Sequence, residues 1–317
     1  MNLMKYRWIF VGIFIATIVL SITFIFINPY NGWGTKPGSS LNLGIDFTGG
    51  TKIYFPLDKA VSSDEVAEVL DKINLPDFKY NPPQPNHYVD SYGNMQYQVI
   101  VYTRFLNDAE QNMVVKALEG EFGKADQGLD ITRVDPLIGK EMLKNSLNAV
   151  LVAALLMLVY IWFRFELLSG VAAIITLLHD SLIVLGIFGL LGKEVNSTMI
   201  AALLTIVGYS INDTIVVFDR IRENQRNKRR ETSFVELVNN SILETFRRSM
   251  NTSLTTLLTI CVLFVMVPNI QELCFALLVG LTAGTYSSLF VASPIWAVVK
   301  DWQDKKRYSQ KPANATR

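Results

Sequence analysis

Hydrophobic side chains fall into six long runs that are separated by polar segments. A helix that crosses the hydrocarbon core of a bilayer needs about 20 residues. The runs cover Trp8–Ile27, Leu147–Phe163, Leu167–Leu191, Thr198–Phe218, Ser249–Val267 and Leu273–Val299. This pattern predicts six membrane-spanning helices, and the last run is long enough to tilt or to include an interfacial turn.

The first run follows two basic residues, Lys5 and Arg7, as the apolar part of a signal peptide does. A signal peptide has an apolar stretch of only ~7–15 residues before a small-residue cleavage site. This run is longer and ends in Phe26-Ile27-Asn28-Pro29, which is a poor cleavage sequence. We therefore expect a retained anchor, with a cleaved leader as the alternative.

Basic residues are distributed unevenly between the two sides of the predicted membrane region. Short cytoplasmic loops are rich in Lys and Arg. If the chain crosses the membrane six times, both termini and two of the loops lie on the same side. The basic residues on that side are Lys5, Arg7, Arg164, Arg220, Arg222, Arg226, Lys228, Arg229, Arg230, Arg247, Arg248, Lys300, Lys305, Lys306, Arg307, Lys311 and Arg317. The two short loops on the other side contain only Lys193. Both termini are therefore predicted to be cytoplasmic, and the basic loop is either a topology signal or a surface for anionic lipid or a cytosolic partner.

The polar segment between the first two runs has the pattern of a compact domain. Strands are expected at 51–55, 78–80, 96–103 and 129–134, with helices at 62–74 and from Asn107 to Gly120 or Gly123. The proline-rich stretch 81–85 is expected to be a loop that cannot pair in a sheet, and His87 to be solvated within it. The order β-α-β-β-α-β is that of a ferredoxin-like domain. The predicted fold class is thus an α-helical integral membrane protein with six transmembrane helices and one α+β ferredoxin-like extracytoplasmic domain.

These patterns divide the chain into four parts. Residues 1–28 form the cytoplasmic N-terminus and the first membrane helix, and 29–144 form the extracytoplasmic domain. Residues 145–299 hold the remaining membrane helices with a basic cytoplasmic loop at 219–248, and 300–317 form a cytoplasmic tail. The composition agrees with a mixture of this kind, because 50% of residues are hydrophobic and 18% are charged, against ~25% charged in an ordinary globular chain.

Composition also excludes several classes of protein. With two Cys and 11 Pro, a disulfide framework and low-complexity disorder are not expected. The net charge of +1 gives no indication of a nucleic-acid partner. The sequence contains no P-loop, no nucleophile–base pair and no metal-ligand cluster, so no enzymatic activity, cofactor or metal is expected.

Asp213 lies within the fourth run, where a charged side chain is costly and by default suggests function. Thr205, Tyr209 and Asp213 are spaced four apart and share one helix face. Asp213 lies seven positions before Arg220, which places it ~10 Å from the cytoplasmic boundary. Desolvation there penalises the charged carboxylate, so this residue is a candidate for binding and releasing a proton near neutral pH. The alternative is a packing carboxylate with a permanent partner.

Arg248 begins a polar stripe on the fifth run. Thr252, Thr255, Thr256 and Thr259 follow it at helical spacing, as expected for a face toward a partner helix or a water-filled cleft. Arg248 enters from the same side as Asp213, so the two side chains are candidates for an ion pair that breaks when the carboxyl takes a proton. Arg247 is off the stripe and is interpreted as an interfacial, snorkelling residue.

His179 and Asp180 lie near the middle of the third run. Adjacent residues point in different directions on a helix, which argues against a metal site. A buried hydrogen-bonded pair, with or without a role in proton transfer, is the preferred interpretation. In the sixth run, Gly280, Gly284 and Ser287 or Ser288 have the spacing of a close helix-packing face rather than of a chemical site.

Several segments resemble the SecF family, which belongs with SecD among the RND-type membrane proteins. They are 43–50 (LGIDFTGG), the His179-Asp180 pair, 207–224 (VGYSINDTIVVFDRIREN) and 245–256 (TFRRSMNTSLTT). Aligned on Thr252-Ser253, the family arginine falls on Arg248. The motif residues are Gly44, Asp46, Phe47, Gly49, Gly50, His179, Gly208, Tyr209, Asn212, Thr252 and Ser253.

This resemblance implies a bacterial inner-membrane protein, with both termini cytoplasmic, that assists preprotein export by using the proton-motive force to move its extracytoplasmic domain. It implies SecD, the SecYEG channel, indirectly the motor SecA, the translocating preprotein and YajC as partners. It also implies proton-coupling roles for Asp213 and Arg248, and Asp180 is a further candidate. The coupling ion is expected to be H⁺, with Na⁺ as the alternative. Competing hypotheses are an RND-type small-molecule efflux component, a purely structural scaffold of the channel and, more distantly, a hydrolytic enzyme.

Overall fold

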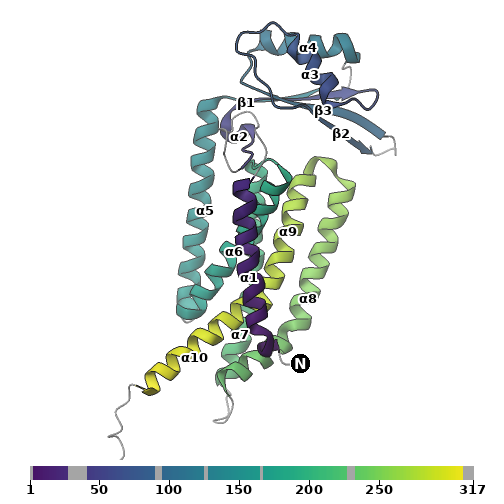
Figure 1. The fold of residues 1–317 in the computed structure, drawn as a ribbon. Coiled ribbons are helices and arrows are strands. Elements are labelled where there is room, and N and C mark those ends of the chain that lie inside the picture. Colours follow the sequence, from purple (N-terminus) through teal and green to yellow (C-terminus); the bar gives the residue numbers. More distant parts are fainter. Residues whose placement is uncertain are drawn as a thin grey trace, which may run out of the picture. The chain divides into compact units, whose positions relative to one another are not determined.

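The computed structural model describes residues 3–27, 41–89, 95–124, 128–164, 167–226 and 233–309 (Figure 1). It divides into two compact units. The helical unit contains Met1–Ile25, Ala149–Ile187 and Thr198–Arg317, and the sheet unit contains Phe26–Asn148 and Phe188–Ser197. The basic residues predicted at 228–230, 311 and 317 lie outside the described residues.

Helices make up most of the chain. Within the described residues, six helical segments are long and apolar enough to cross a membrane: Leu3–Phe26, Pro136–Arg164, Leu168–Leu191, Ser197–Arg226, Phe234–Met266 and Gln271–Lys300. Each overlaps one of the predicted runs. The corresponding helices are α1 (Arg7–Ile27), α5 (Pro136–Arg164), α6 (Leu167–Leu191), α7 (Ser197–Arg226), α8 (Phe234–Met266), α9 (Gln271–Ser287) and α10 (Ser293–Ser309).

The sixth run is not a single straight helix. After α9 the chain forms a π-helical segment, Ser288–Ala292, and then continues as α10. Figure 1 shows α10 running at an angle to α9. A π-helical turn is a known cause of helix bending, so the length of the run reflects a bend rather than only a tilt.

Small residues let the helices of the helical unit approach closely. A Cβ added to Gly186 of α6 would lie 2.6 Å from the Cα of Ser21 on α1. One added to Gly280 of α9 would lie 2.2 Å from Cδ1 of Ile206 on α7. Contacts of this kind are typical of helix packing in membranes.

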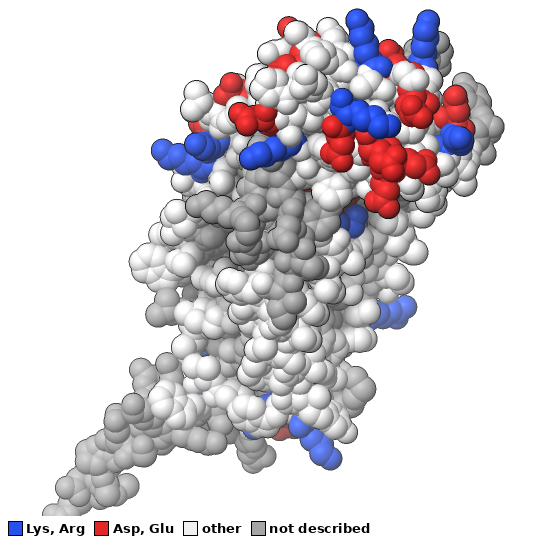
Figure 2. All heavy atoms as spheres, turned by 45° about the horizontal axis from the view of Figure 1, so that its top comes forward, with Lys and Arg blue, Asp and Glu red and all other residues white. Residues whose placement is uncertain are grey.

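Over its described residues, the sheet unit contains four antiparallel strands in the order β2-β3-β1-β4. The strands are β1 (Gly50–Leu57), β2 (Gln84–Val89), β3 (Met95–Thr103) and β4 (Asp130–Val134), and the helices are α2 (Ile45–Thr48), α3 (Ser63–Asp71) and α4 (Asp108–Phe122). The core lies between the sheet and α3 and α4, and it includes the fully buried Ile53, Phe55, Leu70 and Leu118. Charged side chains gather over this unit in the view of Figure 2.

Local capping explains where the helices of this unit begin. The Ser62 hydroxyl accepts from the Glu65 N–H at 3.2 Å. Asn107 and Glu110 form a reciprocal capping box, and Gly123 ends α4 with a φ of 95°. Both helix starts and the end of α4 match the sequence prediction.

The second strand was placed wrongly by the sequence pattern. Residues 78–80 contribute only an isolated bridge from Tyr80 to Thr103. The strand is instead Gln84–Val89, and Pro85 pairs with Val99 within it. β2 is an edge strand, where the missing N–H of a proline can face away from the sheet. His87, expected in a loop, lies on this edge strand and is exposed, as expected.

Candidate functional site

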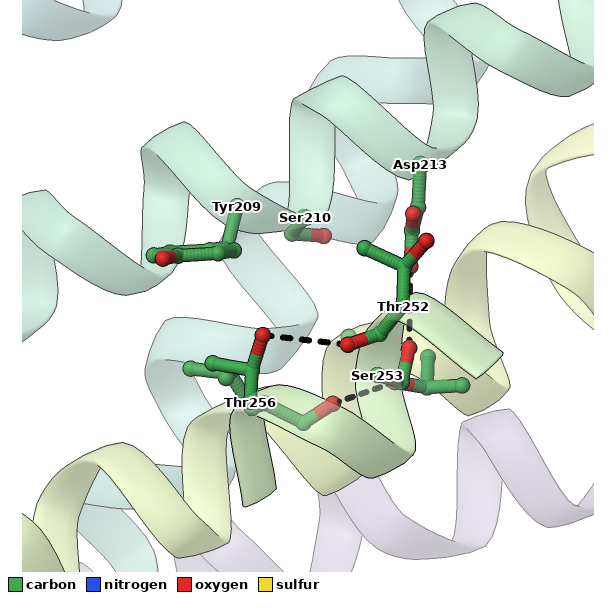
Figure 3. Close-up of a pocket in the computed structure, with 9 residues that line it drawn as sticks. Tyr209, Ser210, Asp213, Thr252, Ser253 and Thr256 are labelled. Atoms are coloured by element: carbon green, nitrogen blue, oxygen red, sulfur yellow. Dashed lines mark hydrogen bonds between the residues drawn. The ribbon is translucent and has the colours of Figure 1, made fainter. Parts of the chain in front are cut away.

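A pocket in the helical unit contains the acidic residue that the sequence singled out. It lies between α7, α8 and α9 (Figure 3). Its lining residues are Tyr209, Ser210, Asp213, Thr252, Ser253, Thr256, Leu281, Gly284 and Thr285. Motif residues from two separate segments of the sequence therefore meet at one pocket.

Asp213 is the acidic residue of this pocket, and its direct partner is a hydroxyl. The Ser253 hydroxyl donates to Asp213 Oδ2 at 3.2 Å. Thr285 Oγ1 lies 2.8 Å from Ser253 Oγ and 2.8 Å from the Leu281 carbonyl oxygen. Ser253 is buried, whereas Asp213 is half-buried. Hydrogen bonds therefore connect the Thr285 hydroxyl of α9, through the Ser253 hydroxyl of α8, to the Asp213 carboxyl of α7.

Arg248 does not form the predicted ion pair in this structure. Among the described residues, no ion pair of 4.0 Å or less joins it to Asp213. The Arg248 side chain is exposed, and the direct partner of Asp213 is the Ser253 hydroxyl instead.

The predicted threonine stripe of α8 has two parts. Thr252 and Thr256 line the pocket, whereas Thr255 and Thr259 are exposed outside it. All four hydroxyls donate at 3.0 Å to a carbonyl one turn earlier on α8. The stripe therefore satisfies its own hydrogen bonds, and only its inner members contribute to the site.

The remaining α7 motif residues surround the pocket. Tyr209 lines it and is 45% exposed. Asn212 is exposed. A Cβ added to Gly208 would meet nothing within 4 Å, so packing within the described residues does not explain the glycine there.

His179 and Asp180 form the buried hydrogen-bonded pair that the sequence suggested. Each is 1% exposed, and His179 Nδ1 lies 3.0 Å from Asp180 Oδ1. Asp180 Oδ2 accepts from Ser210 at 2.6 Å and from Ser287 at 2.9 Å. On the other side, His179 Nε2 lies 2.9 Å from Thr17 Oγ1 of α1. Sequence reasoning missed these three partners, because they come from three other helices.

The small residues of α9 are more than a packing face. Gly284 lines the pocket, and a Cβ there would lie 3.1 Å from Ser210 Cβ. Ser287 donates to Asp180, and the Ser288 hydroxyl lies 3.2 Å from the Ser210 carbonyl oxygen. The purely structural interpretation of this face was therefore incomplete.

The first motif belongs to the sheet unit and has a different role. Asp46 accepts from the Ser197 N–H at 3.0 Å and from its hydroxyl, and Phe47 is 2% exposed. Gly44 N–H donates to the Val195 carbonyl at 3.0 Å. These contacts bind the motif to Val195 and Ser197, where the chain passes from α6 to α7. The motif residues therefore stabilise this connection rather than line the pocket.

The two adjacent glycines of this motif are required by geometry. Gly49 has a φ of +74° and Gly50 a φ of +138°. A Cβ on Gly49 would lie 2.5 Å from the Cα of Pro136, and one on Gly50 would lie 2.6 Å from the Thr103 carbonyl oxygen. Both positions therefore exclude a side chain sterically as well as conformationally.

The site offers carboxyl and hydroxyl oxygens rather than a metal-ligand set. In the part of the chain that the structure describes, no group of three or more His, Cys, Asp or Glu side chains is placed to hold a metal ion. The pocket therefore presents one carboxyl group together with several hydroxyl groups, which can both donate and accept hydrogen bonds.

The six long apolar helical segments of the described residues, with a carboxyl pocket among three helices, define a multi-pass membrane protein. Residues 114–302 match the family described as protein export membrane protein SecD/SecF, C-terminal, and residues 41–61 match the SecD/SecF GG motif. The chain belongs to the SecD/SecF family.

Curated relatives and solved structures agree with this assignment. The protein translocase subunit SecF of Petrotoga mobilis is 38% identical over 91% of this chain and 92% of its own length. The SecDF subunit of Bacillus subtilis is 36% identical over 85% of this chain but only 36% of its own length. A crystal structure of SecDF, a translocon-associated membrane protein from a Thermus species, matches with a TM-score of 0.80 and 35% identity, covering 96% of this chain and 39% of that one.

Proposed function

We propose that this chain is a subunit that uses the proton-motive force to assist preprotein export through SecYEG across the bacterial inner membrane. Family membership supports the accessory role in Sec translocation. The main support for proton coupling is the position of the Asp213 carboxyl in a pocket of the helical unit. This carboxyl accepts a hydrogen bond from Ser253, whose hydroxyl is hydrogen-bonded to Thr285.

A carboxyl with hydroxyl partners is suited to changing its charge. As a carboxylate, Asp213 accepts from Ser253. As a neutral acid it still accepts at its carbonyl oxygen and can also donate, while hydroxyls act in either direction. A nearby cation favours the charged carboxylate, so a movement of Arg248 on α8 toward or away from Asp213 on α7 would alter the affinity of Asp213 for a proton. Proton binding and helix movement are thereby coupled.

The partners follow from the same relationships. A relative named SecDF covers this chain with about a third of its own length, which supports SecD as the partner that supplies the missing part. SecYEG, SecA, the translocating preprotein and YajC complete the proposed assembly. The pocket-forming helices would then be half of a pseudo-symmetric proton pathway.

The proposed topology follows the positive-inside rule. Both termini and the basic loop 219–248 are cytoplasmic, and the residues 29–144 are extracytoplasmic. The strand order β2-β3-β1-β4 with two covering helices supports a ferredoxin-like fold for that domain. We propose no hydrolytic activity and no cofactor, with H⁺ as the coupling ion.

The decisive experiment is proton-driven export by a reconstituted complex of this chain with SecD, SecYEG and SecA. Asp213→Asn keeps the size and hydrogen bonding of the side chain but cannot exchange a proton. We expect export to keep its ATP-driven part and to lose its stimulation by a proton gradient.

Asp219→Asn is the matched control, because Asp219 lies on the same helix and pairs with Arg164 at 3.0 Å outside the pocket. This variant should export normally, since an exposed ion pair contributes only about 0–1 kcal/mol. Normal gradient-stimulated export by a stably assembled Asp213→Asn complex would refute the proposal. Proton-coupled drug efflux with unchanged export would favour the efflux alternative.

A further inference from the structure

Asp180 is a second membrane-buried carboxyl, and it is more enclosed than Asp213. It lies on α6 and contacts side chains of α7 and α9, while its neighbour His179 contacts α1. Phe14 of α1 stacks on the His179 ring with centroids 4.3 Å apart. Among the described residues, His179 is the ionisable partner of Asp180. A net charge at such a buried position in a membrane helix is costly. This cost favours a carboxyl whose charge can be neutralised by a proton or by the neighbouring imidazole.

The hydrogen bonds around Asp180 are compatible with two protonation states. In the charged state, the Ser210 and Ser287 hydroxyls donate to Oδ2, the His179 Nδ1–H donates to Oδ1, and the Thr17 hydroxyl donates to Nε2. If Oδ2 carries a proton, this O–H donates to the Ser210 oxygen, and Oδ1 continues to accept from Nδ1–H. The Ser210 hydroxyl is then released to turn toward the pocket that it lines. Every polar atom of the cluster retains a partner in both states.

Ser210 is the physical connection between the two carboxyls. It lies one turn before Asp213 on α7, lines the same pocket, and donates to Asp180 on α6 at 2.6 Å. Gly284 keeps this contact short, since a Cβ there would lie 3.3 Å from Ser210 Oγ and 3.5 Å from Asp180 Oδ2. The π-helical segment begins next to this point, and such segments are frequent at functional sites.

We propose that Asp180 is a second proton-binding site, which exchanges its proton with the Asp213 pocket through the Ser210 hydroxyl. In the uptake step the Ser210 O–H bond breaks, the proton forms a new bond to Asp180 Oδ2, and Ser210 receives a proton from the pocket. His179 is a positioning residue, whose ring is held between Thr17 and Asp180. The role of Asp180 in export rests on the proton coupling proposed above for Asp213.

Other titratable groups on the packed helices have partners of their own or face elsewhere. On α7, Asp213 accepts from Ser253, and Tyr209 is 45% exposed. On α9, the Tyr286 hydroxyl donates to the Phe10 carbonyl at 3.1 Å. On α1, the charged residue is Arg7, whose guanidinium lies over the Trp8 ring. The charge of the cluster is therefore set by Asp180 and His179 themselves.

The sequence makes a direct measurement feasible, because the chain contains two His. We suggest solid-state NMR of the full chain in lipid bilayers, with ¹⁵N-labelled His and ¹³C-carboxyl-labelled Asp. Transfer of magnetisation from the ring nitrogens selects the Asp180 carboxyl, which lies beside Nδ1 of His179. His87, exposed on β2, serves as an internal reference, because it lies outside the Asp180 cluster.

The expected result is a change of the selected carboxyl signal from the carboxylate to the neutral acid as the pH is lowered. Ser210→Ala should leave both end states accessible but slow proton exchange at Asp180 by about tenfold or more. Ser181→Ala is the matched control, since Ser181 is adjacent to Asp180 but donates to the Leu177 carbonyl. It should exchange like the unsubstituted chain.

Two results would overturn the proposal. One is a carboxyl signal that keeps a single form at every pH at which the unsubstituted chain stays folded. The other is a Ser210→Ala chain that exchanges as fast as the Ser181→Ala control. Neither measurement involves export, so a failure here is separable from a failure of the Asp213→Asn test.

Discussion

Buried charges are handled differently in the two units of the chain. In the sheet unit, Lys52 pairs with Glu194 at 3.1 Å, and its ammonium group lies 5.0 Å and 4.9 Å from the ring centroids of Tyr54 and Tyr102. In the helical unit, Asp213 has a serine hydroxyl as its direct partner and Asp180 has two, together with a histidine. An ion pair fixes both charges permanently, whereas hydroxyls and imidazole tolerate a change of charge. The sheet unit therefore holds a fixed pair of charges, whereas the carboxyls of the helical unit have partners that would accept either charge state.

The largest effect is expected from breaking the fixed pair. Glu194→Ala leaves the Lys52 ammonium buried without its carboxylate, because the two side chains are only 12% and 9% exposed. The expected loss is about 3–5 kcal/mol of unfolding free energy, measured by proteolysis of the sheet unit in the full chain across a denaturant series. Lys52→Met combined with Glu194→Leu should recover most of this loss, since it removes both charges.

The same pair predicts a pH dependence. Burial alone would lower the pKa of Lys52, but the Glu194 carboxylate and the two tyrosines raise it above the ordinary lysine value. Because the native pKa is raised, the stabilisation is fully present below about pH 10.4 and is lost only as the pH rises toward the native pKa. The stability difference between the unsubstituted chain and the double variant should therefore be constant at neutral pH and change only in strong alkali. A change between pH ~5 and 8, where histidine titrates, would contradict a fixed pair.

A smaller loss is expected at Asp180. Asp180→Ala deprives the Ser210 and Ser287 hydroxyls and the His179 ring of their common acceptor. We expect a cost of about 2–4 kcal/mol, since each lost hydrogen bond within a membrane contributes about 0.6–1.7 kcal/mol. Unfolding in mixed detergent micelles, followed by helix content, measures it. Asp180→Asn keeps an acceptor and should lose less than half as much; an equal loss in both variants would mean that the charge, and not the hydrogen bonding, stabilises the cluster.

A substitution at Gly284 tests how closely α9 must approach the Asp180–Ser210 pair. Gly284→Ala places a methyl group 3.1 Å from Ser210 Cβ, and we expect a loss of about 1–2 kcal/mol from overpacking. Gly208→Ala is the control, because a Cβ there meets nothing within 4 Å. It should be neutral or stabilise the helix by up to about 1 kcal/mol. Equal unfolding free energies for the two variants would show that the α7–α9 contact is not tight.

The smallest change in stability is expected at Ser253, together with a distinct change in function. Ser253→Ala removes the hydroxyl bound to Asp213, but that carboxyl is half-buried and open to the pocket. We expect less than ~1 kcal/mol of destabilisation and a several-fold fall in gradient-stimulated export. Thr259→Val is the control, because Thr259 is exposed and donates to its own helix. A large loss of stability with normal export would assign Ser253 to packing and remove the contrast between the units.

The hydrophobic pattern was sufficient for most of the fold. Six runs gave six apolar helical segments, and Asn107 with Glu110 predicted the start of α4 because a capping box is a local signal. The second strand was misplaced because the rule that excludes proline applies to central strands, and nothing local shows that Pro85 lies on an edge. Edge position is a property of the whole sheet.

The site was predictable only in part, for a similar reason. The placement of Asp213 or Asp180 in an apolar run is visible in the sequence, since charge and hydropathy conflict there. Their partners Ser253, Ser210 and Ser287 come from other helices, and a serine in an apolar helix gives no signal of which helix it faces. The expected ion pair with Arg248 failed because depth in the membrane restricts two side chains to a layer but does not bring them into contact.

The close approach of the Gly49–Gly50 pair to Pro136 and Thr103 has a consequence for the modularity of the chain. Gly50 at the start of β1 pairs with Val134 at the end of β4, and Gly49 packs against Pro136 at the start of α5. The chain therefore enters and leaves the four-stranded sheet at neighbouring points, so the sheet is an insertion between two helices. Such insertions can be exchanged or excised by joining two adjacent ends. Exchange of residues 50–134 would therefore require a single splice between adjacent ends, together with a new partner for the buried Glu194 carboxylate.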